Sequence, residues 1–214
     1  MTHTQNTLDQ APETSGLLIK GWLARFYDLF DLIGTNKVRR ATVRAGKVQP
    51  GEAVLDVGCG TGTLALLLEE PVGPKGRVEG IDASLDMLAR ARKKLAKRHS
   101  RANVQPAVAE DLPFGDGEFD LVTSTYVFHH LPDDLRPQAL AEIKRVLKPG
   151  GRVLIVDLAG GPHSFVGFLM SVFGHAHGGY AEGLEAQMKD AGFSGVRRLR
   201  SKKFKSEAFI RGTV

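Results

Sequence analysis

Short apolar runs alternate with amphipathic stretches through the middle of the chain. The apolar runs are four to six residues long, as is typical of buried strands, and occupy residues 53–57, 78–81, 104–109, 120–124 and 152–156. Between them, three segments repeat apolar positions at helical spacing, namely residues 64–70, 84–98 and 134–147. Strands that alternate with helices of this length predict a mostly parallel sheet covered on both faces.

Turn and capping residues agree with this pattern. Ser84 is a suitable N-cap for the helix that follows it, and Asp86 is favourable in the first turn of that helix. The helix over residues 134–147 is expected to be closed by Pro149-Gly150-Gly151. Two of the three predicted helices therefore have a start or stop signal.

The N-terminal 50 residues follow a different pattern. Residues 1–15 lack periodicity, which predicts a disordered tail. Residues 17–33 repeat apolar positions at helical spacing, and a second short helix is expected through Val43 and Val48. Residues 16–50 are therefore predicted to form an N-terminal helical cap.

The C-terminal part also departs from the alternation. A helix is predicted over residues 180–191, and the runs 195–200 and 204–211 then follow with no helix between them. Two such runs predict a hairpin added to the sheet edge. Residues 51–214 are thus expected to form one domain, with an inserted segment near residues 160–180.

Composition is that of a globular domain, with 42% hydrophobic and 25% charged residues in 214. Cys59 is the single cysteine, which excludes an intramolecular disulfide and a multi-cysteine zinc site. No apolar stretch approaches the roughly 20 residues of a membrane span, and the first residues do not resemble a signal peptide. A cytoplasmic location is the default expectation.

The net charge of +5 is unevenly distributed, with basic clusters at residues 90–101 and 197–205. Charge runs of this kind usually form solvated faces of helices and strands, and that interpretation is preferred here. Contact with nucleic acid or with an anionic membrane surface is the alternative.

The turn after the first predicted strand carries the most specific signal, the sequence VLDVGCGTG over residues 54–62. Gly58 and Gly60 allow a sharp turn and the close approach of a ligand, and the following helix start offers backbone N–H groups. The dinucleotide fingerprint requires glycine or alanine where this chain has Thr63. Asp56 would repel a pyrophosphate but suits a ligand that carries an ammonium and a sulfonium, which favours S-adenosylmethionine.

Acidic residues also follow the next two predicted strands. Asp82 is placed to accept hydrogen bonds from ribose hydroxyls, and Ala83 and Met87 can pack on an adenine. Glu110 and Asp111 follow the third strand, where an acid can accept from an adenine amino group. Because the carboxyl ends of parallel strands share one edge of the sheet, these acids are expected to form one site.

With these motifs in view, the chain resembles the class I methyltransferases of the type 11 group. It is similar to the ubiquinone/menaquinone-biosynthesis methyltransferases and to bacterial phospholipid N-methyltransferases, over roughly residues 26–211. The motifs that carry the resemblance are VLDVGCGTG, GIDAS at 80–84, EDLPF at 110–114, FDLV at 119–122 and LKPGG at 147–151. They are specific for fold and cofactor and nearly silent about the substrate.

The resemblance implies an α/β, Rossmann-like three-layer sandwich, whose seven-stranded, mostly parallel sheet has its last strand antiparallel. It implies that Asp56, Gly58 and Gly60 face the methionine part of S-adenosylmethionine, that Asp82 binds the ribose and that Asp111 binds the adenine amino group. The whole expected cofactor-binding set is Asp56, Gly58, Cys59, Gly60, Asp82, Ala83, Met87, Glu110, Asp111, Leu112 and Thr125.

Two residues are the expected catalytic candidates. His130, with His129 beside it, follows the fourth strand and could deprotonate or orient an acceptor. In relatives a tyrosine of a Tyr-Asp pair closes over the cofactor, so Tyr27-Asp28 is the lid candidate. A histidine packed at the strand–helix junction is the simpler interpretation of His130.

The segment over residues 160–180 is the most individual part of the sequence. Its apolar run at 165–173 and the helix over residues 17–33 could cover the active site, which favours an apolar, lipid-like or quinone-like acceptor. Equally, both could simply cover the core. No metal site is expected from His163, His175 and His177, since no acid or cysteine stands near them.

These residues together predict S-adenosylmethionine-dependent methyl transfer to a small or lipid-like apolar acceptor. No stable nucleic-acid partner is expected, peripheral membrane contact stays open, and the sequence indicates no oligomeric state. Two alternatives remain: a methyltransferase acting on nucleic acid or protein, and a Rossmann nucleotide-binding protein that is not a methyltransferase.

Overall fold

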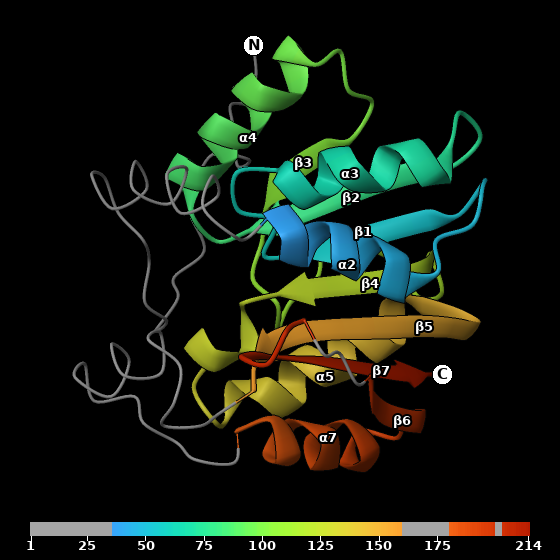
Figure 1. Cartoon of the computed structure of the whole chain (residues 1–214), viewed down its shortest axis with the longest axis vertical. Coiled ribbons are helices and arrows are strands. Elements are labelled where there is room, and N and C mark those ends of the chain that lie inside the picture. The colour runs from blue at the N-terminus through green and yellow to red at the C-terminus, as the bar shows by residue number, and fades with distance from the viewer. Residues whose placement is uncertain (1–35, 160–179, 200–202) are drawn as a thin grey trace, which may run out of the picture.

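A computed structural model describes residues 36–159, 180–199 and 203–214. These residues form a three-layer α/β sandwich around one seven-stranded sheet of order β3-β2-β1-β4-β5-β7-β6 (Figure 1). The strands are β1 Ala53–Val57, β2 Arg77–Asp82, β3 Asn103–Pro106, β4 Phe119–Thr125, β5 Leu147–Leu158, β6 Ser194–Leu199 and β7 Glu207–Thr213. The helices are α2 Asn36–Gly46, α3 Thr63–Val72, α4 Leu85–Lys97, α5 Leu135–Val146 and α7 Tyr180–Asp190, with a short 3₁₀ turn, η2, at Phe128–His130.

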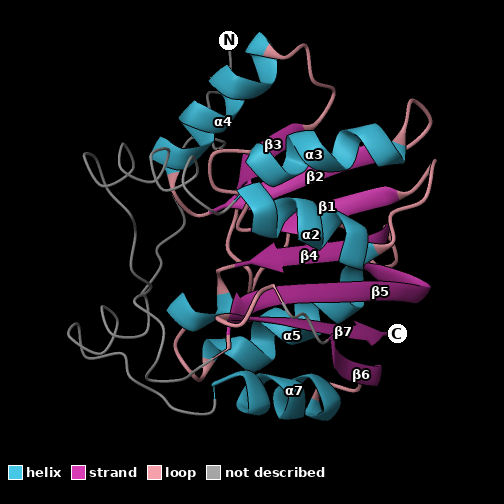
Figure 2. Ribbon diagram, viewed as in Figure 1, coloured by secondary structure: helices cyan, strands magenta, loops and turns pink. Residues whose placement is uncertain are grey.

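The predicted mostly parallel sheet is confirmed. β1 to β5 are parallel to one another, whereas β7 runs antiparallel to both β5 and β6. The last strand is therefore antiparallel as expected, and it inserts between β5 and β6 rather than forming the outer edge. The helices cover the two faces of the sheet (Figure 2).

Successive side chains of β1 pack into the hydrophobic cores on opposite faces of the sheet. Val54 of β1 packs in one cluster with Leu68 of α3 and Val38 of α2. Leu55, the next residue, packs on the opposite face with Ile143 of α5. Because both faces are buried, β1 reads as a continuous apolar run, which is why it was visible in the sequence.

Helix α2 is fastened at its C-terminal end by one arginine. Arg152 of β5 donates from Nε to the carbonyl of Gly46 at 2.7 Å and pairs with Glu52 at 2.8 Å. Lys47, just after the helix, has a positive φ of 51°, so the helix ends before Val48 and the expected extension through Val48 is wrong. The N-terminal residues 1–35, including the predicted tail and the helix over residues 17–33, lie outside the described residues.

Two other predicted boundaries need correction. The third strand ends at Pro106 instead of residue 109. Ala107 makes the last bond to β2, donating to the carbonyl of Asp82 at 3.3 Å, and the chain then turns, with Asp111 donating to the carbonyl of Val108 at 3.4 Å. Pro149-Gly150-Gly151 does not close the helix. α5 ends at Val146, and these residues form an irregularity within β5, where Leu147 pairs with Phe119 but Arg152 already pairs with Leu121.

Other expected features are present. Ser84 caps α4 by accepting from the backbone N–H of Met87 at 3.4 Å. None of the helices in the described part of the chain is both long and apolar enough to cross a membrane. The inserted segment over residues 160–179 lies outside what the structure describes.

Candidate active site

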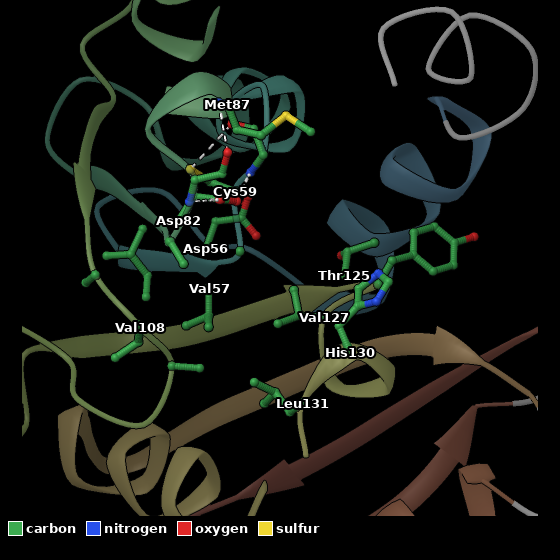
Figure 3. Close-up of a pocket in the computed structure, with 18 of the residues that line it drawn as sticks. Asp56, Val57, Cys59, Asp82, Met87, Val108, Thr125, Val127, His130 and Leu131 are labelled. Atoms are coloured by element: carbon green, nitrogen blue, oxygen red, sulfur yellow. Dashed lines mark hydrogen bonds between the residues drawn. The ribbon is translucent and has the colours of Figure 1, made fainter. Parts of the chain in front are cut away.

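The candidate site lies at the carboxyl ends of β1, β2 and β4, on either side of the point where the strand order reverses. In open parallel sheets this crevice is where ligands bind. A pocket occupies it, and Figure 3 shows Cys59, Asp82 and Met87 toward one end and Thr125 and His130 toward the other. Its lining includes most of the expected site residues, namely Asp56, Gly58, Cys59, Gly60, Asp82, Ala83, Met87, Glu110, Thr125 and His130.

The glycine turn forms the floor of the pocket. Gly58 and Gly60 have positive φ values of 73° and 55°. The N–H groups of Gly58 and Cys59 both donate to the carbonyl of Ile81 at 2.8 Å, so the turn is tied to the end of β2. Burial, and then the charges of Asp56 and Asp82, raise the pKa of the Cys59 thiol well above its usual range, which keeps this sulfur protonated and unreactive.

Gly58 and Gly60 require glycine for different reasons. A Cβ on Gly58 would lie 2.2 Å from Cγ2 of Val127, whereas a Cβ on Gly60 would meet nothing within 4 Å. The chain therefore needs glycine at 58 for space as well as for its backbone conformation, and at 60 for conformation alone.

Gly58→Ala is expected to lower the free energy of unfolding by about 3 kcal/mol, since strain at positive φ adds to overpacking against Val127. Gly60→Ala is the matched control and should cost only about 1–2 kcal/mol. Urea unfolding of both variants measures the difference. Val127→Ala should recover part of the Gly58→Ala loss, and equal destabilisation of the two glycine variants would contradict this account.

Asp82 is held by the turn that it supports. Its Oδ2 accepts from the N–H of Gly60 at 2.8 Å and its Oδ1 from the N–H of Ser84 at 2.9 Å. Burial raises the pKa of the Asp82 carboxyl, although these two N–H groups oppose the shift. A carboxylate offers about four acceptor positions, so two are left for a ligand's hydroxyl groups.

Asp56 is the more unusual acid because it is 2% exposed and lies one residue before the end of β1. It accepts one hydrogen bond from Oγ1 of Thr123 at 2.9 Å. Burial raises the pKa of Asp56 to about 7, against the opposing effects of that hydrogen bond and of the Arg39 charge. A carboxylate buried with so little compensation is suited to a cationic partner supplied by a ligand.

The third wall of the pocket differs from the expectation. Glu110 lines the pocket, but Asp111 is exposed and Leu112 is buried in the core at 3% exposure, and neither contributes to the lining. Val108 and Ala109 line it instead and were missed. The roles assigned to Asp111 and Leu112 remain predictions without a place in this pocket.

The far end of the pocket is mainly apolar. Val127, Leu131, Pro132 and Leu135 line it together with Tyr126, His130 and Arg39. Oγ1 of Thr125 is buried and has no hydrogen-bond partner within the described residues, so it is a polar atom that a ligand could satisfy.

Tyr126 has a strained backbone at this end of the pocket. Its φ of 60° is rare for a residue other than glycine, and its hydroxyl donates to Oε1 of Glu207 at 3.1 Å. Burial, and then the Glu207 charge, raise the pKa of the Tyr126 phenol, so it stays protonated. Sequence reasoning did not single out Tyr126, since neither its backbone strain nor its distant partner leaves a local signal.

A histidine–aspartate pair adjoins this end of the pocket and was also missed. Nδ1 of His129 lies 2.6 Å from Oδ1 of Asp157, and the two side chains are 11% and 1% exposed. The rings of His129 and His130 are 3.8 Å apart between centroids. The sequence signal was an acid at the end of the fifth apolar run, a position like that of Asp56 and Asp82.

Several expected features lie outside the described residues. These are Tyr27-Asp28, the apolar run at 165–173, His163, His175 and His177. Among the residues that are described, no group of three histidine, cysteine, aspartate or glutamate side chains could hold a metal ion. The basic clusters lie on and after α4 and on β6 and the segment after it, and their described members do not line the pocket.

Comparison with known proteins agrees with this geometry. A family model described as a methyltransferase domain matches residues 54–151. Demethylmenaquinone methyltransferase from Halalkalibacterium halodurans is 40% identical over 120 residues, which cover 56% of this chain and 48% of that protein. Ubiquinone/menaquinone biosynthesis C-methyltransferase UbiE from Teredinibacter turnerae is 35% identical over 162 residues, covering 73% and 64%.

A solved structure of an S-adenosylmethionine-dependent methyltransferase from Aquifex aeolicus superposes with a TM-score of 0.67 at 25% identity, covering 82% of this chain and 89% of that one. The chain spans about half the length of the first curated relatives that it matches. The matched family model covers the glycine turn, Asp82 and His130 alike. Residues 54–151, which build most of the pocket, therefore match a methyltransferase domain.

Proposed function

We propose that this protein transfers a methyl group from S-adenosylmethionine to a small apolar acceptor, and that the acceptor is a hydroquinone. The main observation in favour of S-adenosylmethionine as the cofactor is the buried Asp56 carboxylate in the pocket wall. A cationic ligand group would offset its desolvation, whereas a pyrophosphate would add a second negative charge. The same charge argument disfavours a nicotinamide dinucleotide.

The residues of the pocket fit this cofactor from end to end. Asp82 has acceptor positions for two ribose hydroxyls, and Met87 and Ala83 supply apolar contacts beside it. Gly58 and Gly60 let the backbone approach the ligand, and Asp56 faces a cationic group. When bound, S-adenosylmethionine supplies an electrophilic methyl group on its sulfonium.

The apolar end of the pocket would receive the acceptor. Val127, Leu131, Pro132 and Leu135 exclude water from an aromatic ring, which favours a displacement that needs alignment and desolvation. His130 is the general base in this proposal, because its imidazole faces the pocket and can take a proton from a ring hydroxyl. Loss of that proton makes the adjacent ring carbon nucleophilic. Once this carbon carries the methyl group, it must lose its own hydrogen as a proton to restore the aromatic ring, and S-adenosylhomocysteine would be the leaving group.

Two observations support a hydroquinone as the methyl acceptor. The lining beyond Thr125 is largely apolar, and the matched relatives are named as methyltransferases of menaquinone and ubiquinone biosynthesis. Peripheral membrane contact, which such an acceptor would favour, stays a prediction. No feature of the described pocket favours nucleic acid or protein as the acceptor.

Titration calorimetry with S-adenosylmethionine, S-adenosylhomocysteine and NADH tests the cofactor. Micromolar binding of the first two and none of NADH is expected. Transfer of a labelled methyl group to a reduced naphthoquinone that lacks the ring methyl tests the acceptor. Tight NADH binding would overturn the cofactor, whereas methylation of phosphoethanolamine but not of the quinol would overturn only the acceptor.

His130→Ala is expected to lower kcat about 100-fold while S-adenosylmethionine binds with unchanged affinity, since the proposed base acts on the acceptor. His99→Ala is the matched control, because this exposed histidine lies after α4 and outside the pocket lining. Full activity of His130→Ala would show that the acceptor needs no base from this residue.

A further inference from the structure

Asp157 is a buried acid that the proposed reaction does not use. It lies near the carboxyl end of β5, and its side chain is 1% exposed. Burying a carboxylate is costly unless it is well hydrogen-bonded. Asp157 accepts three hydrogen bonds: from the His129 N–H at 3.2 Å, from His129 Nδ1 at 2.6 Å and from the Leu158 N–H at 2.8 Å.

Two of these three hydrogen bonds come from the same residue. Asp157 holds His129 by its main chain and by its ring, so the end of β5 is fastened to η2. Because an ionised carboxylate only accepts, Nδ1 of His129 must carry a proton, which sets how this ring is protonated and oriented. The ring of His129 therefore cannot turn without breaking a short hydrogen bond.

The fixed ring lies against His130. The two ring centroids are 3.8 Å apart with planes inclined by 44°. Only His130 of this pair lines the pocket, where Figure 3 shows it beside Thr125. His129 and Asp157 are thus placed behind the residue that faces the acceptor.

We propose that Asp157 and His129 are positioning residues, which hold the His130 imidazole at the acceptor end of the pocket. This inference rests on the proposed role of His130 as the base. In many sites a carboxylate orients a functional imidazole by a direct hydrogen bond. Here the ring of His129 lies between the carboxylate of Asp157 and the functional imidazole of His130. Asp157 acts on the reaction only through His129 and His130.

Two substitutions separate the fastening from the ring contact. Asp157→Asn has the size of the acid, but its NH₂ group replaces one acceptor oxygen, so at least one of the two bonds to His129 is lost in either orientation of the amide, and the other is no longer made to a charged acceptor. His129→Asn retains a donor near the position of Nδ1 and therefore the bond to Asp157, but it removes the ring against His130. Each variant is expected to lower kcat about 10- to 100-fold, with the KM for the quinol and the affinity for S-adenosylmethionine changed less than about twofold.

Asp120→Asn is the matched control for destabilisation. Asp120 lies near the start of β4, where it accepts from the Ala53 N–H at 2.8 Å and pairs with Lys148 at 2.8 Å, away from the pocket. It should lower the melting temperature without lowering kcat. His129→Asn should show the converse, because its bond to Asp157 survives. A kcat within about twofold of the wild type for His129→Asn would overturn the proposal.

A spectroscopic readout tests the arrangement without methyl transfer. The Nδ1 proton of His129 in the wild type should give a downfield NMR resonance that moves upfield or disappears in Asp157→Asn, because its acceptor is then neutral or turned away. The ring signals of His130 should shift in the same variant. Unshifted His130 signals would overturn the positioning role, even if the protein had no activity on the quinol. If the wild type and both variants methylated the quinol equally well, the proposed function would stand and only the positioning role would be overturned.

Discussion

The Asp82→Ala variant is expected to bind S-adenosylmethionine at least about 100-fold more weakly than the wild type, because hydrogen bonds to a charged acceptor contribute about 1.5–3 kcal/mol each and two are lost. The same substitution also removes the acceptor of the Gly60 and Ser84 N–H groups. The glycine turn then loses one of its bonds to the end of β2, while the bonds from Gly58 and Cys59 to the carbonyl of Ile81 remain. Both effects weaken binding, and titration calorimetry measures their sum.

Asp82→Asn separates the two effects. An asparagine of the same size keeps one oxygen for either Gly60 or Ser84, so it should retain more of the turn than alanine does and bind with intermediate affinity. Glu79→Ala is the matched control on the same strand, because Glu79 bonds to Asn103 and does not line the pocket. If Asp82→Ala bound the cofactor as tightly as Glu79→Ala, this carboxylate would not be a cofactor ligand.

The sequence predicted most of the fold because buried parallel strands read as short, mostly apolar runs. Val54 and Leu55 serve opposite cores, so both must be apolar, and β1 was located to the residue. The acids that end such strands were equally visible, since Asp56 and Asp82 interrupt apolar runs at the edge where ligands bind. The resemblance then added the antiparallel last strand.

The errors fall where the chain leaves the sheet. Glu110 and Asp111 follow a strand that ends at Pro106, so strand alternation no longer indicates which of them faces the pocket. Pro149-Gly150-Gly151 has the composition of a helix stop, but its place within β5 depends on pairing with β4, which lies more than twenty residues away in the chain. The Asp157–His129 pair joins two elements in the same way and has no local signature.

Asp56→Asn is expected to stabilise the ligand-free protein at neutral and alkaline pH while weakening S-adenosylmethionine binding about 100-fold. The folded-state pKa of Asp56 is about 7, against a usual value of 3.8. Ionised Asp56 therefore opposes folding. Its stability contribution is complete below the unfolded pKa, falls as the pH rises toward the folded pKa and is lost above it.

The difference in unfolding free energy, variant minus wild type, should accordingly rise by about 4 kcal/mol between roughly pH 4 and pH 8. Taking the difference between the two free energies of unfolding cancels the pH dependence that the variant and the wild type have in common. Asp120→Asn is a control of opposite sign: although burial opposes it, hydrogen bonds from Lys148 and from Ala53 lower the pKa of Asp120 below 3.8. Its difference should therefore fall only as the pH rises to about 4, and stay nearly level between roughly pH 4 and pH 8. A flat profile for Asp56→Asn would mean that this carboxylate is compensated in the ligand-free protein.

Cofactor affinity should follow the same ionisation in the opposite sense. A cationic ligand binds the ionised form of Asp56, so wild-type affinity should rise about tenfold per pH unit below pH 7 and level off above it, whereas the Asp56→Asn profile should lack this rise. Calorimetry between roughly pH 5.5 and 7.5 would measure both slopes. Ionised Asp56 would then lower the stability of the ligand-free protein and raise its affinity for the cofactor. Such a loss of stability in favour of function is expected where a buried charge is paired only when the ligand binds.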